Sequence, residues 1–120
     1  MLETGPAAAE INWVRILGKG EVGIADFKKA LTGAPGQAVL DVRTNDEAAT
    51  GKFDNAIHIP LDELEARLAE LPKDKEILVH CTTGARAEMA WQALGKAGYK
   101  SRFLVADVEC EGGGCKIIDE

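Results

Sequence analysis

The sequence has few cysteines, few aromatic residues and no long apolar run. Three cysteines in 120 residues are too few for the disulfide framework of a small secreted domain, and their odd number leaves at least one thiol free. No apolar stretch approaches the roughly 20 residues of a membrane-spanning helix, and the first residues lack the features of a signal peptide. We therefore expect a cytoplasmic protein, although a periplasmic protein or a domain excised from a longer chain would look the same.

Positive charge is also scarce. Fourteen lysines and arginines stand against twenty acidic residues, which gives a formal net charge of −6, and the basic residues form no run or stripe. We therefore expect neither nucleic acid nor a membrane as a partner. The length and a hydrophobic content of 46% predict one domain over 11–120 after a flexible tail over 1–10. No metal or other cofactor is expected.

Short apolar stretches alternate with stretches of helical periodicity. The pattern predicts strands over 11–17, 37–42, 56–59, 76–80 and 101–106, and helices over 24–31, 45–50, 62–71 and 85–97. This alternation is typical of βαβ units, so it predicts an α/β fold with a mainly parallel sheet of about five strands, flanked by helices on both faces. Asp62 is expected to cap its helix, and Met89, Ala90 and Ala93 to form the buried stripe of the last helix.

One cysteine lies where a predicted strand meets a predicted helix. Cys81 follows the strand 76–80, and the helix begins near Arg86. Unpaired backbone N–H groups and the helix dipole at this point favour the thiolate, which is the nucleophile. Gly84 allows successive N–H groups to converge into an anion-binding nest. A buried structural cysteine is the simpler alternative, but the small and polar residues that follow favour sulfur chemistry on an anionic substrate.

Four motifs in a fixed order resemble the rhodanese family. They are Asp41-Val42-Arg43, the stretch 51–60, Leu61-Asp62-Glu63-Leu64 and the loop from Cys81 to Arg86, and the resemblance is strongest over 37–106. Rhodaneses have a three-layer α/β fold, and their cysteine takes up a sulfane sulfur as a persulfide and passes it on. The resemblance implies a sulfurtransferase in which Cys81 is catalytic. The substrate-binding residues would be Thr82, Thr83, Gly84, Ala85 and Arg86.

The expected substrate is a small anionic sulfur donor, either thiosulfate or a persulfide, and the acceptor is cyanide or a thiol, including a protein thiol. Related cysteine phosphatases have five residues between cysteine and arginine. Here four residues separate Cys81 from Arg86, which favours sulfur over a phosphoryl group. Asp41 and Arg43 are expected to support the loop without taking part in the chemistry. His80 should point away from Cys81, so no cysteine–histidine pair is expected.

The chain departs from the family pattern at two places. Residues 51–56 read Gly-Lys-Phe-Asp-Asn-Ala where the family often has Gly-His-Ile-Pro-Gly-Ala, and a Gly-rich tail with Cys110 and Cys115 replaces the closing helix. These cysteines could form a disulfide, act as a redox pair or sulfur relay for Cys81, or be ordinary thiols; their spacing does not suit zinc. The rival function is a non-catalytic or redox-sensing module that binds a partner protein, with these cysteines as redox partners.

Overall fold

The computed structural model describes residues 17–118, and its centre is a five-stranded sheet in the order β1-β5-β4-β2-β3. All neighbouring strands in this sheet are parallel. The strands are β1 (Glu21–Val22), β2 (Gln37–Asp41), β3 (Ala56–His58), β4 (Glu76–His80) and β5 (Ser101–Leu104). The predicted parallel α/β fold is therefore confirmed.

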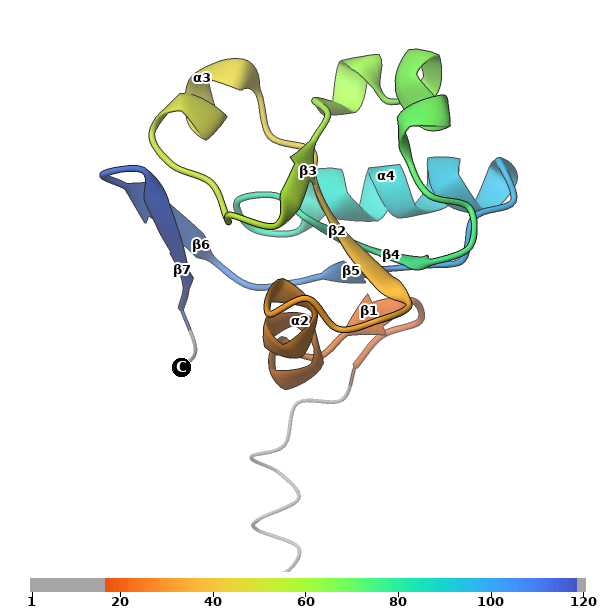
Figure 1. Ribbon diagram of the computed structural model, residues 1–120, viewed down its shortest axis with the longest axis horizontal. Helices are drawn as coiled ribbons and strands as arrows, with labels where there is room; N and C mark the ends of the chain where they lie inside the picture. The colour runs from red at the N-terminus through yellow and green to blue at the C-terminus, as the bar shows by residue number, and fades with distance from the viewer. Residues whose placement is uncertain (1–16, 119–120) are drawn as a thin grey trace, which may run out of the picture.

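Helices cover both faces of the sheet (Figure 1). They are α2 (Ile24–Leu31), α3 (Asn45–Ala49), the 3-10 helices η1 (Leu61–Glu63) and η2 (Glu65–Glu70), and α4 (Ala85–Lys96). Alternate residues of β4 serve opposite faces, as the pleat of a strand requires. Ile77 and Val79 pack in one core with Leu94 of α4, and Leu78 packs in another with Phe27 of α2. We call these the α4-side core and the α2-side core.

The chain between the two prolines at 60 and 72 differs from the prediction. A continuous helix capped by Asp62 is wrong, because the structure has two 3-10 helices with no side-chain cap. Leu61 N donates to Val42 O at 3.1 Å and Glu63 N donates to Pro60 O at 2.9 Å, so the first turn begins before Asp62. Arg67 has φ −118° and ψ 17°, which interrupts the helical run.

The buried face of α4 is also different. Met89 is 57% exposed, so the predicted stripe is wrong at this residue. Ala87, Ala90 and Leu94 are the fully buried residues of the helix, and their spacing of three and four places them on one face. Ala93 is half-buried beside them. Met89 lies one residue away from that face and points outward.

The two ends of the described chain hold features that the sequence analysis did not predict. The strand expected over 11–17 falls outside the described residues except for Leu17, which is in no strand, and the tail over 1–10 falls outside them entirely. The first strand of the sheet is instead the two-residue β1, paired with β5. At the other end, β6 (Val108–Glu111) and β7 (Gly114–Ile117) form an antiparallel hairpin. It packs against the α2-side core through Val108 and Ile117, apart from the main sheet (Figure 1).

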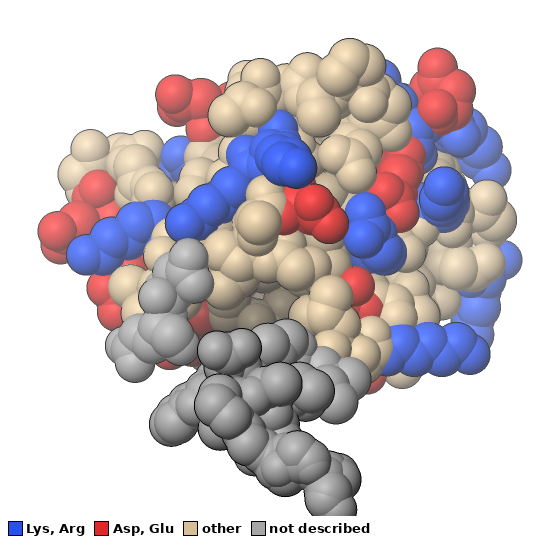
Figure 2. Space-filling view, turned by 90° about the horizontal axis from the view of Figure 1, so that it is seen from below, with Lys and Arg blue, Asp and Glu red and all other residues tan. Residues whose placement is uncertain are grey.

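Charged side chains of both signs share the surface. On the face shown in Figure 2, lysines and arginines are interspersed with aspartates and glutamates rather than gathered into a field of one sign. Within residues 17–118, no helix has the length and apolar character needed to cross a membrane.

Candidate functional site

Cys81 lies in the turn between β4 and α4, at the carboxyl end of a central strand. Its side chain is 2% exposed and belongs to the α4-side core. The Gly84 amide donates a hydrogen bond to Cys81 Sγ at 3.1 Å. Gly84 has φ +128°, and a Cβ there would come within 3.1 Å of Val105 Cα. A glycine is therefore needed for the tight turn that aims this amide at the sulfur.

The start of α4 surrounds the Cys81 turn with hydrogen-bond donors. The first N–H groups of a helix have no partner within it, and the helix dipole is positive at that end. In α4 the first backbone hydrogen bond of the helix runs from Glu88 N to Gly84 O, at 2.9 Å, so the amides before Glu88 have no acceptor within the helix. Thr83 and Ala85 are exposed, and Thr82 is half-buried. The loop can therefore present N–H groups to an anion beside the thiol.

Arg86 binds Glu47, a residue of α3. Its Nη1 lies 2.6 Å from Glu47 Oε1 and its Nη2 lies 3.0 Å from Oε2. The Thr82 hydroxyl donates to Glu47 Oε2 and accepts from Arg86 Nη2, both at 3.2 Å. The hydrogen bonds from Arg86 lower the pKa of Glu47 to about 2. The arginine expected to hold the substrate thus has its charge balanced by a carboxylate, and its guanidinium also hydrogen-bonds the Thr82 hydroxyl of the loop.

Glu47 is a site residue that the sequence analysis missed. The spacing of Thr44 and Glu47 is that of a capping box, and the structure shows this reciprocal cap at the start of α3. Such a cap is a local signal. The contact between Glu47 and Arg86 spans 39 residues of sequence, and nothing in the local pattern reports it.

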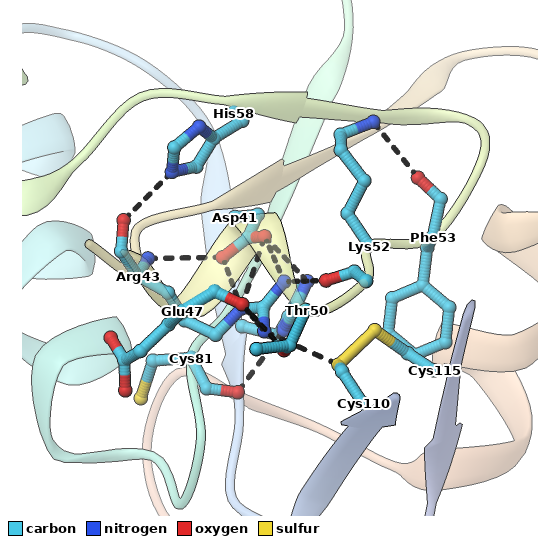
Figure 3. A network of polar contacts seen from close by, with 12 residues as sticks. Asp41, Arg43, Glu47, Thr50, Lys52, Phe53, His58, Cys81, Cys110 and Cys115 are labelled. Carbon is cyan, nitrogen blue, oxygen red and sulfur yellow. Dashed lines mark hydrogen bonds and ion pairs between the residues drawn. A yellow bond between two sulfur atoms is a disulfide. The ribbon is translucent and has the colours of Figure 1, made fainter. Parts of the chain in front are cut away.

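Asp41 and Arg43 form a buried ion pair at the end of β2 (Figure 3). They are 0% and 2% exposed, and Arg43 Nη2 lies 2.8 Å from Asp41 Oδ2. Burial alone would raise the pKa of Asp41, but the hydrogen bonds from Arg43 and the electrostatic attraction of His80 and Arg43 together hold the pKa below its usual value. Arg43 also donates to Gly51 O at 2.7 Å and to Glu47 O at 3.3 Å. These contacts reach the helix that carries Glu47, and a supporting role for the pair stays a prediction.

The two histidines do not face the thiol. His80 lies in contact with the α2-side aromatic rings of Phe27 and Phe53, and its Nδ1 hydrogen-bonds Cys81 O at 3.1 Å. Its buried Nε2 has no hydrogen-bond partner among residues 17–118 and lies 4.0 Å from Asp41 Oδ2. Burial lowers the pKa of His80, which favours the neutral ring. His58 Nε2 pairs with Arg43 O at 2.8 Å.

Cys110 and Cys115 face each other across the hairpin and form a disulfide. They pack beside the α2-side core, whereas Cys81 belongs to the α4-side core. Figure 3 shows the disulfide on one side of the Asp41–Arg43 pair and Cys81 on the other. The structure therefore does not bring the three sulfurs together, and Cys81 is the free cysteine. Within residues 17–118, no cluster of histidine, cysteine and carboxylate side chains is suited to a metal ion.

The fold and the Cys81 loop have counterparts among known proteins. A family model described as a rhodanese-like domain matches residues 24–108, and the chain belongs to this family. It is 35% identical over 80 residues to the putative sulfur carrier protein YrkF of Bacillus subtilis, covering 67% of this chain and 43% of YrkF. It is 34% identical over 61 residues to a sulfurtransferase of Allochromatium vinosum, covering 51% and 57% of the two chains. Further matches are named tRNA uridine(34) hydroxylase.

A solved structure supports the same assignment. The human single-domain sulfurtransferase TSTD1 matches with a TM-score of 0.63 and 26% identity, over 73% of this chain and 90% of the human one. By contrast, the chain spans only about half the length of the two bacterial relatives. The similarity therefore covers the rhodanese-like domain and leaves part of each of these two relatives unmatched.

Proposed function

We propose that this rhodanese-like domain is a sulfurtransferase in which Cys81 carries the sulfur as a persulfide. The observation that carries the proposal is the hydrogen bond from the Gly84 amide to Cys81 Sγ at the start of α4. An N–H donor and the positive end of a helix both stabilise negative charge on sulfur. The sulfurtransferase and sulfur-carrier names of the relatives agree with this role.

In the first half of the proposed cycle, the Cys81 thiolate attacks the outer sulfur of thiosulfate. The sulfur–sulfur bond of thiosulfate breaks, and sulfite leaves with the electron pair. Cys81 then carries a terminal sulfur with one negative charge, which the Gly84 amide and the other N–H groups of residues 82–86 would stabilise. A persulfide donor would react in the same way, with a thiolate as the leaving group.

In the second half, cyanide or a thiolate attacks the terminal sulfur and the Cys81 thiolate leaves. The products are thiocyanate or a new persulfide, and the enzyme returns to its starting state, which is ping-pong chemistry. Because Glu47 balances the charge of Arg86, backbone amides are the principal anion ligands in this proposal. Arg86 would bind the donor directly only if it exchanged part of its contact with Glu47.

Intact-protein mass spectrometry after thiosulfate treatment tests the proposal. Since Cys110 and Cys115 are paired, Cys81 is the thiol able to take up sulfur. We expect a mass increase of one sulfur atom, its loss on addition of cyanide with release of thiocyanate, and no increase in Cys81→Ser. Cys110→Ser/Cys115→Ser is the matched control and should still take up sulfur at Cys81.

An unchanged mass with thiosulfate and with a small-molecule persulfide would contradict the proposal. The alternative function inferred from the sequence, a non-catalytic or redox-sensing module that binds a partner protein, would then be favoured. The low exposure of Cys81, 2%, is the observation that favours this rival.

A further inference from the structure

The disulfide of the hairpin is accessible from the surface. Cys110 and Cys115 are half-buried, and both line a surface cavity of about 350 Å³. Exposed residues of the same two strands, Glu109, Glu111 and Lys116, form other parts of its wall. An external thiol can therefore approach the two sulfurs, which is not so for a disulfide enclosed in a core.

The hairpin is attached to the Cys81 loop and to the turn after α3. Val108 N, at the start of β6, donates to Thr82 O at 2.8 Å. At the tip, Gly113 N donates to Thr50 O at 3.1 Å, and Lys52 N donates to Gly113 O at 3.3 Å. The disulfide joins β6 to β7 between these two attachments. It therefore holds the hairpin in the conformation in which both sets of hydrogen bonds form.

The tip approaches the turn at Gly51 very closely. Gly51 forms a bridge with Gly113, and a Cβ on Gly51 would lie 2.5 Å from Gly114 O. The backbone contact therefore depends on a glycine here. It also depends on the hairpin keeping its shape, because the attachment is made by main-chain groups of both segments.

The surroundings of the two sulfurs differ. Arg43 Nη1 donates to Cys110 Sγ at 3.2 Å (Figure 3), and Cys115 has no such contact with a cation among residues 17–118. A guanidinium stabilises a thiolate, so Cys110 is the better leaving group when the bond is broken. Thiol–disulfide exchange proceeds faster when the leaving thiol forms the more stable thiolate.

We propose that Cys110–Cys115 is a redox site, opened by a dithiol reductant that attacks Cys115, and that opening it loosens the Cys81 loop. The reductant's thiolate attacks Cys115 Sγ, the disulfide breaks, and Cys110 leaves as a thiolate beside Arg43. The second thiol of the reductant loses its proton to solvent and attacks the mixed disulfide. The reductant becomes a disulfide, and Cys115 leaves and takes up a proton. Two electrons pass from reductant to hairpin, and the consequence for sulfur transfer rests on the function proposed above.

Thiol labelling of the Cys81→Ser protein tests the redox site, because the hairpin then holds the only cysteines of the chain. The folded protein is reduced with dithiothreitol, freed of it, and alkylated with iodoacetamide over a series of pH values. We expect Cys110 to react at least about tenfold faster than Cys115 at the lowest pH that gives a measurable rate. Lys116→Ala is the control for a hairpin cation that contacts neither sulfur, and should keep this preference.

Two outcomes of the labelling would overturn the proposal. One is a disulfide that dithiothreitol does not open in the folded protein. The other is a Cys115 that reacts as fast as Cys110 or faster, since the contact with Arg43 would then not select the leaving thiolate.

Amide hydrogen exchange of the same protein tests the link to the loop. On reduction we expect about tenfold faster exchange at Val108 and in residues 82–86, with unchanged exchange in the middle of α4. Cys81→Ser/Cys110→Ser/Cys115→Ser should exchange as the reduced Cys81→Ser protein does, and identical exchange before and after reduction would overturn the link. Absence of sulfur uptake at Cys81 of the wild-type protein in both redox states would overturn the proposed function alone, because labelling and exchange do not depend on it.

Discussion

The Cys81 loop and the β6–β7 hairpin hold their cysteines in opposite ways. Cys81 is a free, buried thiol at the end of a central strand, and its sulfur accepts a backbone N–H at the start of a 12-residue helix. Cys110 and Cys115 are half-buried, bonded to each other, and carried by two short strands outside the main sheet. The surrounding backbone therefore differs between the two. A helix terminus places a backbone N–H donor against the thiol of Cys81, whereas in the hairpin the disulfide joins two paired strands.

One arginine lies between the two regions. Arg43 contacts Cys110 Sγ in the hairpin, and through Glu47 O it contacts the helix whose carboxylate binds Arg86. The comparison therefore predicts that changes at the shared residues affect both regions, while changes at the edge of one region stay local.

The largest loss of stability is expected for Arg43→Met, because the substitution removes the side chain that contacts both regions. The substitution leaves the fully buried carboxylate of Asp41 without its cation. Breaking a buried pair in this way costs about 3–5 kcal/mol of the free energy of unfolding. Urea denaturation measures the change.

The double variant Asp41→Asn/Arg43→Met is the control for this effect. It removes the uncompensated charge and should recover part of the lost stability. A loss below about 1 kcal/mol in the single variant would mean that the pair does not join the two regions energetically.

An intermediate effect on stability is expected from His80. Its Nδ1 bonds Cys81 O, and its ring lies beside the α2-side core, against which the hairpin packs. In the folded state, burial holds the pKa of His80 below its ordinary value of 6.5. As the pH falls below 6.5, the unfolded chain binds a proton that the folded protein does not, so the free energy of unfolding falls. The slope is at most about 1.4 kcal/mol per pH unit for one proton.

Urea denaturation between about pH 7 and about pH 5 measures the slope. His80→Gln keeps a polar group without a titrating ring, and His58 remains in both proteins as an internal control. An identical slope in wild type and variant would show that His80 is not the titrating group.

The smallest effect on stability is expected for Glu47→Gln, which changes the loop side alone. The side chains of Arg86 and Glu47 are 31% and 37% exposed, so solvent screens the pair and the loss should be about 0.2–1 kcal/mol. The pKa of Glu47 is lowered from 4.5 to about 2. The contribution is therefore fully present above pH 4.5 and is lost as the pH falls toward 2, where the two proteins should converge.

The rate of sulfur uptake at Cys81 measures the positioning role of this glutamate separately. It should fall in Glu47→Gln, because Arg86 and Thr82 lose the carboxylate that orients them. Reactivity of the Cys110 thiol in the reduced hairpin should stay unchanged, and a change there would remove the distinction between the two regions.

Much of the fold and the position of Cys81 were predictable because their signals are local. The apolar run of β4, the glycine at 84 and the periodicity of α4 lie within a few residues of one another, and the structure confirms this strand, turn and helix. The side-chain roles around Cys81 stay predictions.

What the sequence did not predict depends on contacts between distant segments. The bond between Glu47 and Arg86 has no local signature, and β1 is a strand only because it pairs with β5. Leu61 begins η1 earlier than a local cap would, because its amide bonds the end of β2. The hairpin was not predicted because its sequence is ambiguous. Three glycines between two cysteines are as compatible with a flexible loop as with the tight turn of a β-hairpin.

The two stretches that depart from the family pattern contact each other. The start of the turn and the tip of the hairpin are joined by the bridge between Gly51 and Gly113, which consists of the backbone hydrogen bonds from Gly113 N to Thr50 O and from Lys52 N to Gly113 O. Two departures that looked independent in the sequence are therefore in direct backbone contact in the structure.

The Gly51–Gly113 contact limits how this domain can be recombined. A hairpin joined to its host by backbone groups, a glycine and one buried arginine is not an interchangeable module. Grafting residues 105–118 onto another rhodanese-like scaffold would require the turn at 51–55 and Arg43 to be transferred with it. Protein engineers who want a redox-responsive version of this fold should therefore transplant three separate stretches of sequence together.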